Sequence, residues 1–309
     1  MNSATRWLIS LSVLGLVLFW IEPHRIAAQI QSLHPGWLML ALTVTVLQTA
    51  LSAWRWRFTA GQLGLPLSWP RALGDYYLAC FANQALPGGV LGDAWRAQRH
   101  ARSSGQLGAA WQAVILERAS GQVLVGLFSL LALVLIPTWR HALASFAISS
   151  MPWLMLALIV LTVVSMTVVR LVLQRWPEAV ASFREALNLA MLARKAWPWQ
   201  LFSSLLIVAS YALVFALAAR AIGVVLPWDQ LMLVALPVLL AMLIPLSVAG
   251  WGWREAMAGA LWFSLGQPPE QGIAVSIAYG AIVAVGATPG ILVWLRRPAP
   301  SSTPFPSSE

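Results

Sequence analysis

The sequence predicts an all-α polytopic membrane protein, with about six full transmembrane helices and two re-entrant, broken-helix hairpins. The first observation is composition: 60% of the 309 residues are hydrophobic and 9% are charged, whereas a soluble domain carries about 25% charged residues. The second is the length of the apolar runs, several of which match the roughly 17 to 25 residues that cross a bilayer. The third is a pair of shorter apolar runs that each stop at a proline, which is typical of a half-helix.

Six apolar windows predict the full spans. The first window follows Arg6, as in a signal peptide, but no small-residue cleavage pattern comes after Phe19. We therefore interpret it as a retained span. The windows are 7–21, 37–53, 109–136, 153–169, 201–219 and 273–295.

Two further apolar runs predict the first halves of the hairpins, because 73–86 stops at Pro87 and 231–244 stops at Pro245. Proline removes an amide donor and glycine lets the backbone turn. In hydrocarbon, the freed backbone groups need protein, water or a bound polar group as partners. Broken helices at bilayer depth therefore predict a cavity. Their N-termini, together with nearby arginines, suit an anionic group such as a lipid phosphate.

The formal net charge of +9 comes from arginines that mostly lie beside the apolar windows. In a soluble protein this charge would favour nucleic acid as a partner, whereas here it sets orientation, because basic loops stay in the cytoplasm. If 73–97 forms a hairpin that enters and leaves the membrane on the cytoplasmic side, then Arg55, Arg57 and Arg71 lie on the same side as Arg96. The second hairpin then enters from outside. This count places both termini, 54–72, 98–108 and 170–199 in the cytoplasm, and 22–36, 137–152 and 267–271 outside.

The two halves of the chain, 7–136 and 153–295, show the same order of span, span, hairpin and span. Because each half has an odd number of full crossings, the second half is expected to be inverted relative to the first. The spacing P-x4-G-x3-R occurs in both breaks, which supports an inverted repeat. We expect a single transmembrane domain over 1–297 and a Pro/Ser-rich disordered tail over 298–309.

Metal, redox and cofactor chemistry find little support in the sequence. Cys80 is the only cysteine, so neither an intrachain disulfide nor a CxxC site can form. The four histidines fall in predicted loops without the spacing of metal ligands. We therefore expect no metal, no cofactor and no enzymatic activity of the chain itself.

Three ordered motifs carry a resemblance that extends over nearly the whole chain. They are FANQALPGGVLGDAWR at 81–96, LERASG at 116–121 and IPLSVAGWGWREA at 244–256. Together they resemble the flippase-like transmembrane family related to the membrane region of lysylphosphatidylglycerol synthases. Leu91 and Ala249 depart from the family pattern, which has glycine at both positions. The resemblance implies substrate-binding roles for Asn83, Pro87, Gly88, Gly92, Asp93, Arg96, Glu117, Arg118, Pro245, Ser247, Gly250, Gly252, Arg254 and Glu255.

The matching residues also have structural interpretations. Asp93 and Arg96, three residues apart, are also compatible with a snorkelling helix end. Glu117 and Arg118 are compatible with structural ion pairs to another helix, and Asn83 with a cap on the broken backbone. Charges at membrane depth cost about 2.5 to 3.5 kcal/mol on insertion scales, so either interpretation requires partners or water.

The resemblance implies a protein that moves an anionic or aminoacylated phospholipid, or a polyprenyl-phosphate-linked glycolipid, between leaflets. One alternative is a non-catalytic membrane partner of a lipid-modifying enzyme or glycosyltransferase. Another is an integral membrane lipid transferase, with Asp93, Glu117 or Glu255 as general base. The soluble aminoacyl-transferring domain of the synthases is expected to be absent after Leu295. Because Lys195 is the only lysine among many arginines, we expect a GC-rich bacterial genome and hence a bacterial inner membrane.

Overall fold

The computed structural model describes residues 33–85, 89–140, 166–167, 170–171, 174–243 and 250–295, and no strand occurs among them. Within this part of the chain, four stretches are helical, long and apolar enough to cross a membrane. They confirm the windows 37–53, 109–136, 201–219 and 273–295, whereas 7–21 and most of 153–169 lie outside the described residues. The four stretches are α3 (Pro35–Gln62), α6 (Leu107–Leu135), α10 (Trp197–Ala221) and the pair α13 (Pro269–Gly286) and α14 (Pro289–Leu295).

Helix α3 extends beyond its predicted window. No residue between Ala53 and Gln62 forces the chain out of a helix, and the first left-handed residue is Gly64, with φ +74°. The prediction that Arg55 lies in a cytoplasmic loop is therefore wrong, because Arg55 lies on α3 and is 3% exposed. The extra turns bring a basic residue to the helix bundle's interior.

The first predicted hairpin corresponds to α4 (Trp69–Ala85) and α5 (Leu91–Ser104), which pack against each other. A side chain at Gly92 would collide with the backbone of Ala79, so glycine allows this close approach of the two helices. Residues 86–88, where the break at Pro87 is predicted, lie outside the described residues. The segment 98–108, predicted as a loop, is helical up to Ser104.

The second predicted hairpin corresponds to α11 (Trp228–Leu240), the short helix η2 (Ala241–Leu243) and α12 (Trp253–Ser264). Residues 244–249, where the break at Pro245 is predicted, lie outside the described part. Helix α12 begins after Gly252, which has a left-handed φ of +91°. The carboxylate of Glu255 accepts a hydrogen bond of 2.7 Å from the Gly252 amide. This bond satisfies one of the free donors at the helix N-terminus.

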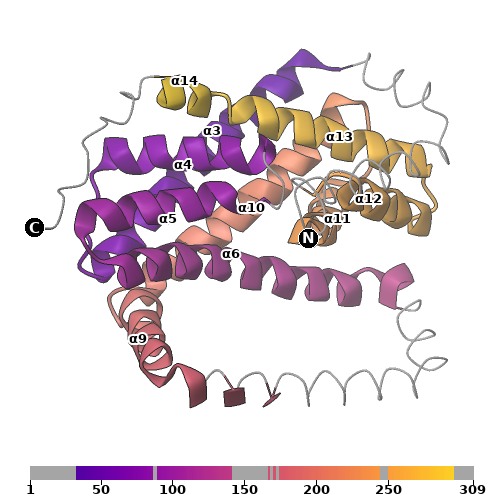
Figure 1. Ribbon diagram of the computed structural model, residues 1–309. Helices are drawn as coiled ribbons and strands as arrows, with labels where there is room; N and C mark the ends of the chain where they lie inside the picture. The colour runs from indigo at the N-terminus through magenta and orange to yellow at the C-terminus, as the bar shows by residue number, and fades with distance from the viewer. Residues whose placement is uncertain are drawn as a thin grey trace, which may run out of the picture.

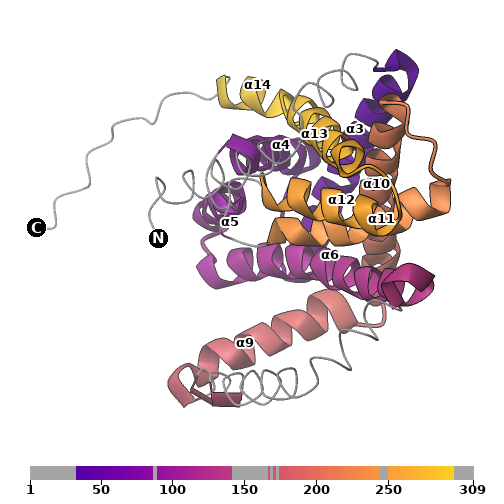
Figure 2. The same ribbon diagram turned by 90° about the vertical axis from the view of Figure 1, so that its right-hand side faces the viewer.

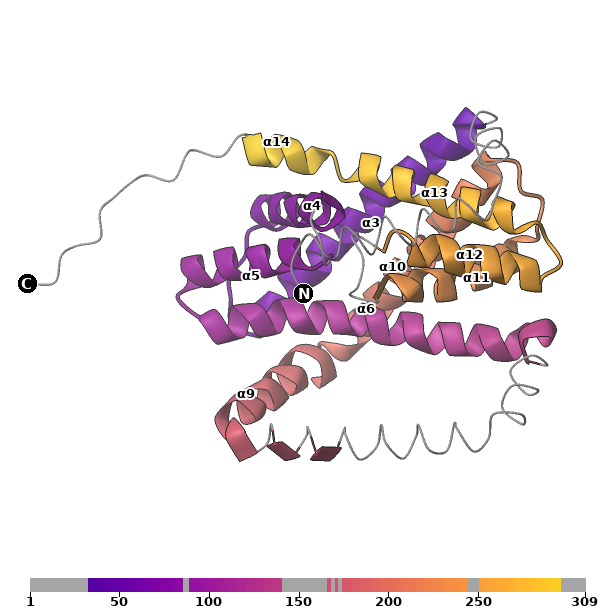
Figure 3. The same cartoon turned by 45° about the vertical axis from the view of Figure 1, so that its right-hand side comes forward.

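The two helix pairs lie side by side between two long helical layers, as Figure 3 shows. On one side, α6 packs against both α5 and α11. On the other side, α12 packs against α13, and α4 packs against α14. Each pair is thus held between α6 and the α13–α14 stretch (Figure 1).

Helices α3 and α10 form the most extensive contact between two helices and are joined by polar side chains. Gln200 donates to the Thr59 hydroxyl at 2.9 Å, and Ser210 donates to Gln48 at 3.2 Å. Hydrogen bonds of this kind stabilise helix pairs in a membrane, where apolar surface gives no preference for protein over lipid. Outside this bundle, α9 (Pro177–Leu187) and the π-helix η1 (Asn188–Leu192) lie next to α6 (Figure 2).

Candidate functional site

A buried carboxylate, Glu117 on α6, binds two arginines from two other helices. Its Oε1 lies 2.7 Å from Nη2 of Arg55 on α3, and its Oε2 lies 2.6 Å from Nη2 of Arg96 on α5. The Tyr76 hydroxyl on α4 donates a longer bond of 3.3 Å to the same carboxylate. Because the Glu117 and Arg96 side chains are both 0% exposed, these bonds form away from the surface. One glutamate therefore joins four helices.

Asp93 extends this network along α5. Its Oδ1 lies 2.8 Å from Nε of Arg96, and its Oδ2 lies 2.8 Å from Nη2 of Arg118. The Asn83 amide donates to Asp93 at 2.9 Å and its carbonyl oxygen accepts the Gly92 amide at 2.8 Å. Asn83 thus links the end of α4 to the start of α5 across the break. We call Arg55, Asp93, Arg96, Glu117 and Arg118 the Glu117 cluster.

The Glu117 cluster contains more positive than negative charge. Three guanidinium groups face two carboxylates, which leaves a net charge of +1. Nε of Arg55, Nη1 of Arg96 and Nε of Arg118 are buried without a hydrogen-bond partner among the described residues. Buried donors of this kind normally have partners, so these unpaired nitrogens favour the binding of a hydrogen-bond acceptor beside them.

Aromatic rings and partial exposure define two sides of the Glu117 cluster. The Arg96 guanidinium lies 4.7 Å from the ring centroids of both Trp56 and Tyr76, which attract a desolvated cation. In contrast, the side chain of Arg118 is 31% exposed and that of Asp93 is 11% exposed. The cluster is therefore closed around Arg96 and open at Arg118.

A second, smaller cluster lies between α12 and α13 and consists of Arg254 and Glu255 on α12 and Ser276 on α13; we call it the Arg254 cluster. Nε of Arg254 donates to Ser276 at 2.8 Å, and its Nη2 lies 2.8 Å from the Glu255 carboxylate. Ser276 donates in turn to Glu255 at 2.8 Å. Arg254 also lies 4.9 Å from the Trp251 ring centroid. Its charge is balanced by Glu255, although its Nη1 is buried without a partner among the described residues.

The structure thus groups the matching residues that it describes around two centres. Asn83, Gly92, Asp93, Arg96, Glu117 and Arg118 belong to or contact the Glu117 cluster, and Gly250, Gly252, Arg254 and Glu255 belong to or precede the Arg254 cluster. Pro87, Gly88, Pro245 and Ser247 lie outside the described residues.

Sequence reasoning did not include Arg55 or Ser276 in the site. For Arg55, a signal is present in the sequence. Gln48, Ser52, Arg55 and Thr59 follow one another at intervals of three and four residues within a mostly apolar helix, and all four are buried. This spacing places them on one helix face, as a polar stripe directed into the bundle.

Metal ligation finds no support in the described part of the chain, because no group of three or more His, Cys, Asp or Glu side chains occurs there. The three carboxylates discussed above all pair with arginine.

A family model described as "Lysylphosphatidylglycerol synthase TM region" matches residues 7–290. The chain belongs to this family. The match covers both clusters and every matching motif residue, and it identifies a multi-pass membrane protein connected with lipid metabolism. A search of curated proteins found no match.

Proposed function

We propose that the protein is a lipid transporter that binds an anionic or aminoacylated phospholipid, or a polyprenyl-phosphate-linked glycolipid, and moves it between leaflets. The observation that carries the proposal is the net charge of +1 in the Glu117 cluster, with buried arginine donors that have no partner among the residues that the structure describes. Guanidinium groups bind phosphate oxygens through paired hydrogen bonds. A phosphate would supply both the missing acceptors and the missing negative charge.

The partly exposed Arg118 offers a route to this phosphate. A headgroup that reaches Arg118 first can form a bond there while Asp93 keeps its second bond to Arg96. Buried ion pairs are costly to separate unless a new partner replaces the old one. An anionic headgroup is such a partner, so its entry can exchange bonds within the cluster without leaving a charge unpaired.

Symmetric helix packing supports an inverted repeat, which would give the transporter two related halves. The contacts of α3 with α4, α6 and α13 correspond to those of α10 with α11, α13 and α6. Likewise, α6 packs against α11 as the α13–α14 stretch packs against α4. We infer two re-entrant hairpins that enter from opposite faces, as in transporters whose broken helices surround the substrate. Both termini would then lie in the cytoplasm of a bacterial cell.

Two other functions remain candidates on the residues present. A non-catalytic partner of a lipid-modifying enzyme or glycosyltransferase would use the same lipid site without transport. A lipid transferase would require a carboxylate free to accept a proton, but Asp93, Glu117 and Glu255 each accept hydrogen bonds from arginine. We therefore propose that the chain has no enzymatic activity of its own.

One experiment separates these functions. The full chain is reconstituted in liposomes that contain fluorescent phosphatidylglycerol or fluorescent phosphatidylcholine. Dithionite quenching then measures leaflet exchange, and mass spectrometry of the recovered lipid detects any covalent change. We expect faster exchange of the anionic lipid than in protein-free liposomes, and an unaltered lipid mass.

The matched variants are Arg118→Gln in the Glu117 cluster and Arg102→Gln, an exposed arginine in the last turn of α5. Only Arg118→Gln should slow the exchange. Lipid exchange at the protein-free rate would contradict transport and favour the partner function, and a changed lipid mass would favour the transferase.

A further inference from the structure

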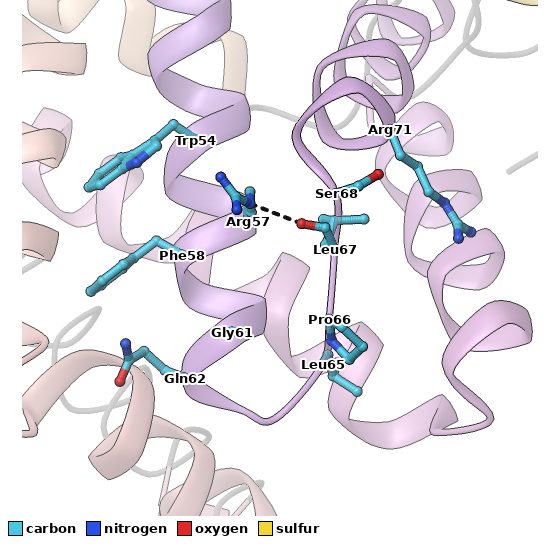
Figure 4. Close-up of a pocket in the computed structure, with 10 residues that line it drawn as sticks. All are labelled: Trp54, Arg57, Phe58, Gly61, Gln62, Leu65, Pro66, Leu67, Ser68 and Arg71. Atoms are coloured by element: carbon cyan, nitrogen blue, oxygen red, sulfur yellow. Dashed lines mark hydrogen bonds between the residues drawn. The ribbon is translucent and has the colours of Figure 1, made fainter.

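A hollow of about 700 Å³ lies where α3 ends and the chain turns into α4. Figure 4 shows its lining residues: Arg57 points from α3 toward the extended segment 65–68, whereas Trp54, Phe58 and Gln62 extend from the other side of the helix. No acidic side chain occurs among the described residues of its wall. The wall consists of Trp54, Arg57, Phe58, Gly61, Gln62, Leu65, Pro66, Leu67, Ser68 and Arg71.

This hollow and the Glu117 cluster use different faces of α3. Trp54, Arg57, Phe58 and Gly61 follow one another at intervals of three, one and three residues, and all four border the hollow. Arg55, on another face, is buried and bonded to Glu117. The hollow is therefore a separate feature of the molecule.

Arg57 is the main cation of the hollow. Its Nε donates to the Leu67 carbonyl at 2.9 Å, which holds the guanidinium between the helix and the loop (Figure 4). Arg57 is exposed, and its two terminal nitrogens are open to a ligand because only Nε is bonded among the described residues. Arg71, at the far edge, is partly engaged, because its Nη2 donates to the Arg99 carbonyl and its Nε lies 3.7 Å from Asp75. Arg57 thus offers free donors, and Arg71 adds positive charge.

Aromatic side chains place the hollow at the level of lipid headgroups. Trp54 stacks on Phe58 with a centroid distance of 5.4 Å and contacts Trp199, at the start of α10, edge-on at 6.4 Å. Tryptophan gathers at the membrane–water interface. In addition, the 28 residues of α3 form a helix of roughly 42 Å, which exceeds the roughly 30 Å of hydrocarbon in a bilayer. The last turns of α3 therefore reach the headgroup region.

We propose that this hollow binds the phosphodiester headgroup of an anionic phospholipid from the adjacent leaflet. The phosphate oxygens accept hydrogen bonds from the terminal nitrogens of Arg57, with the Ser68 hydroxyl as a second donor. The glycerol and the first acyl carbons lie against Trp54 and Phe58. This binding goes beyond the proposed transport, because it requires neither movement of lipid nor the Glu117 cluster.

Photo-crosslinking tests the assignment directly. The full chain in detergent micelles is irradiated with a phosphatidylglycerol probe that carries a diazirine close to the ester groups, and adducts are mapped by peptide mass spectrometry. We expect adducts within residues 54–71. Arg57→Gln should reduce them about tenfold, as loss of one charge-assisted contact predicts, whereas Arg102→Gln, outside the hollow, should leave them unchanged.

Competition identifies the source of the phosphate. Unlabelled short-chain phosphatidylglycerol should remove the adducts at micromolar concentration, and inorganic phosphate should do so poorly. Equal competition by inorganic phosphate would overturn the lipid assignment, as would equal labelling by a phosphatidylcholine probe or adducts that persist in Arg57→Gln. Gel filtration and thermal melting of each variant confirm folding, and a folded parent without adducts in 54–71 would also overturn the proposal. Since adducts report binding alone, failure of lipid transport in liposomes would leave this result unaffected.

Discussion

Glu117 on α6 and Arg96 on α5 form an ion pair of 2.6 Å in which both side chains are fully buried. Arg55 binds the other oxygen of the same carboxylate, so the single negative charge of Glu117 is shared between two guanidinium groups. Removing one partner of a buried pair leaves the other partner without compensation, which costs more than an exposed pair can contribute. The pair therefore couples the proposed lipid site to the stability of the helix bundle.

Glu117→Gln should destabilise the protein by about 3–5 kcal/mol, because an amide leaves Arg55 without its carboxylate and leaves Arg96 with Asp93 alone. It should also impair lipid transport. The control is Glu185→Gln, since Glu185 lies exposed on α9. Thermal melting in detergent and the liposome assay measure both effects. Equal melting temperatures and equal transport for the two variants would show that Glu117 contributes little.

Arg96→Lys and Arg254→Lys should lose transport by about tenfold or more while the proteins still insert and fold. An ammonium group is a point charge and cannot reproduce the fork by which Arg96 joins Asp93 to Glu117. The liposome assay measures the rate, with Arg102→Lys as control. If both variants transported lipid like the parent, or failed only through unfolding, the two arginines would be structural and the lipid site would lie elsewhere.

Gly92→Ala should destabilise the first helix pair by about 1–3 kcal/mol, as overpacking does, because the added methyl group meets the Ala79 backbone. Gly108→Ala is a matched control, since Gly108 also lies on a helix and has open space around it. Thermal melting should give a lower melting temperature for Gly92→Ala than for Gly108→Ala. A Gly92→Ala protein as stable as Gly108→Ala would contradict the close packing of α4 and α5.

Residues 106 and 267 should lie on opposite sides of the membrane. Gln106 precedes α6, and Gln267 lies in the arginine-free turn between α12 and α13. Cysteines at these positions in a Cys80→Ser background are labelled with a membrane-impermeant maleimide in intact cells and in inverted vesicles. Labelling from the same side would contradict the inverted repeat.

Sequence reasoning anticipated most of the described helices and many members of both clusters. Apolar windows and proline breaks are local patterns, and they predicted α3, α4, α6, α10 and α11 to within a few residues at most ends. The motif residues Asp93, Arg96, Glu117 and Arg118 proved to form one connected network. The end of α3 was missed, because a charged residue normally marks the end of a span.

The sequence alone determined that the chain enters a membrane, since the excess of apolar side chains over charges holds for any arrangement of the helices. It also located the prolines and glycines at which breaks of those helices are predicted. Only the tertiary structure decided which charges meet, because Arg55 and Glu117 are separated by 62 residues and are paired by the packing of α3 against α6. A buried charge pairs with an opposite charge that lies close to it in space. In a helix bundle, the distance between two side chains depends on how the helices cross rather than on their spacing along the chain.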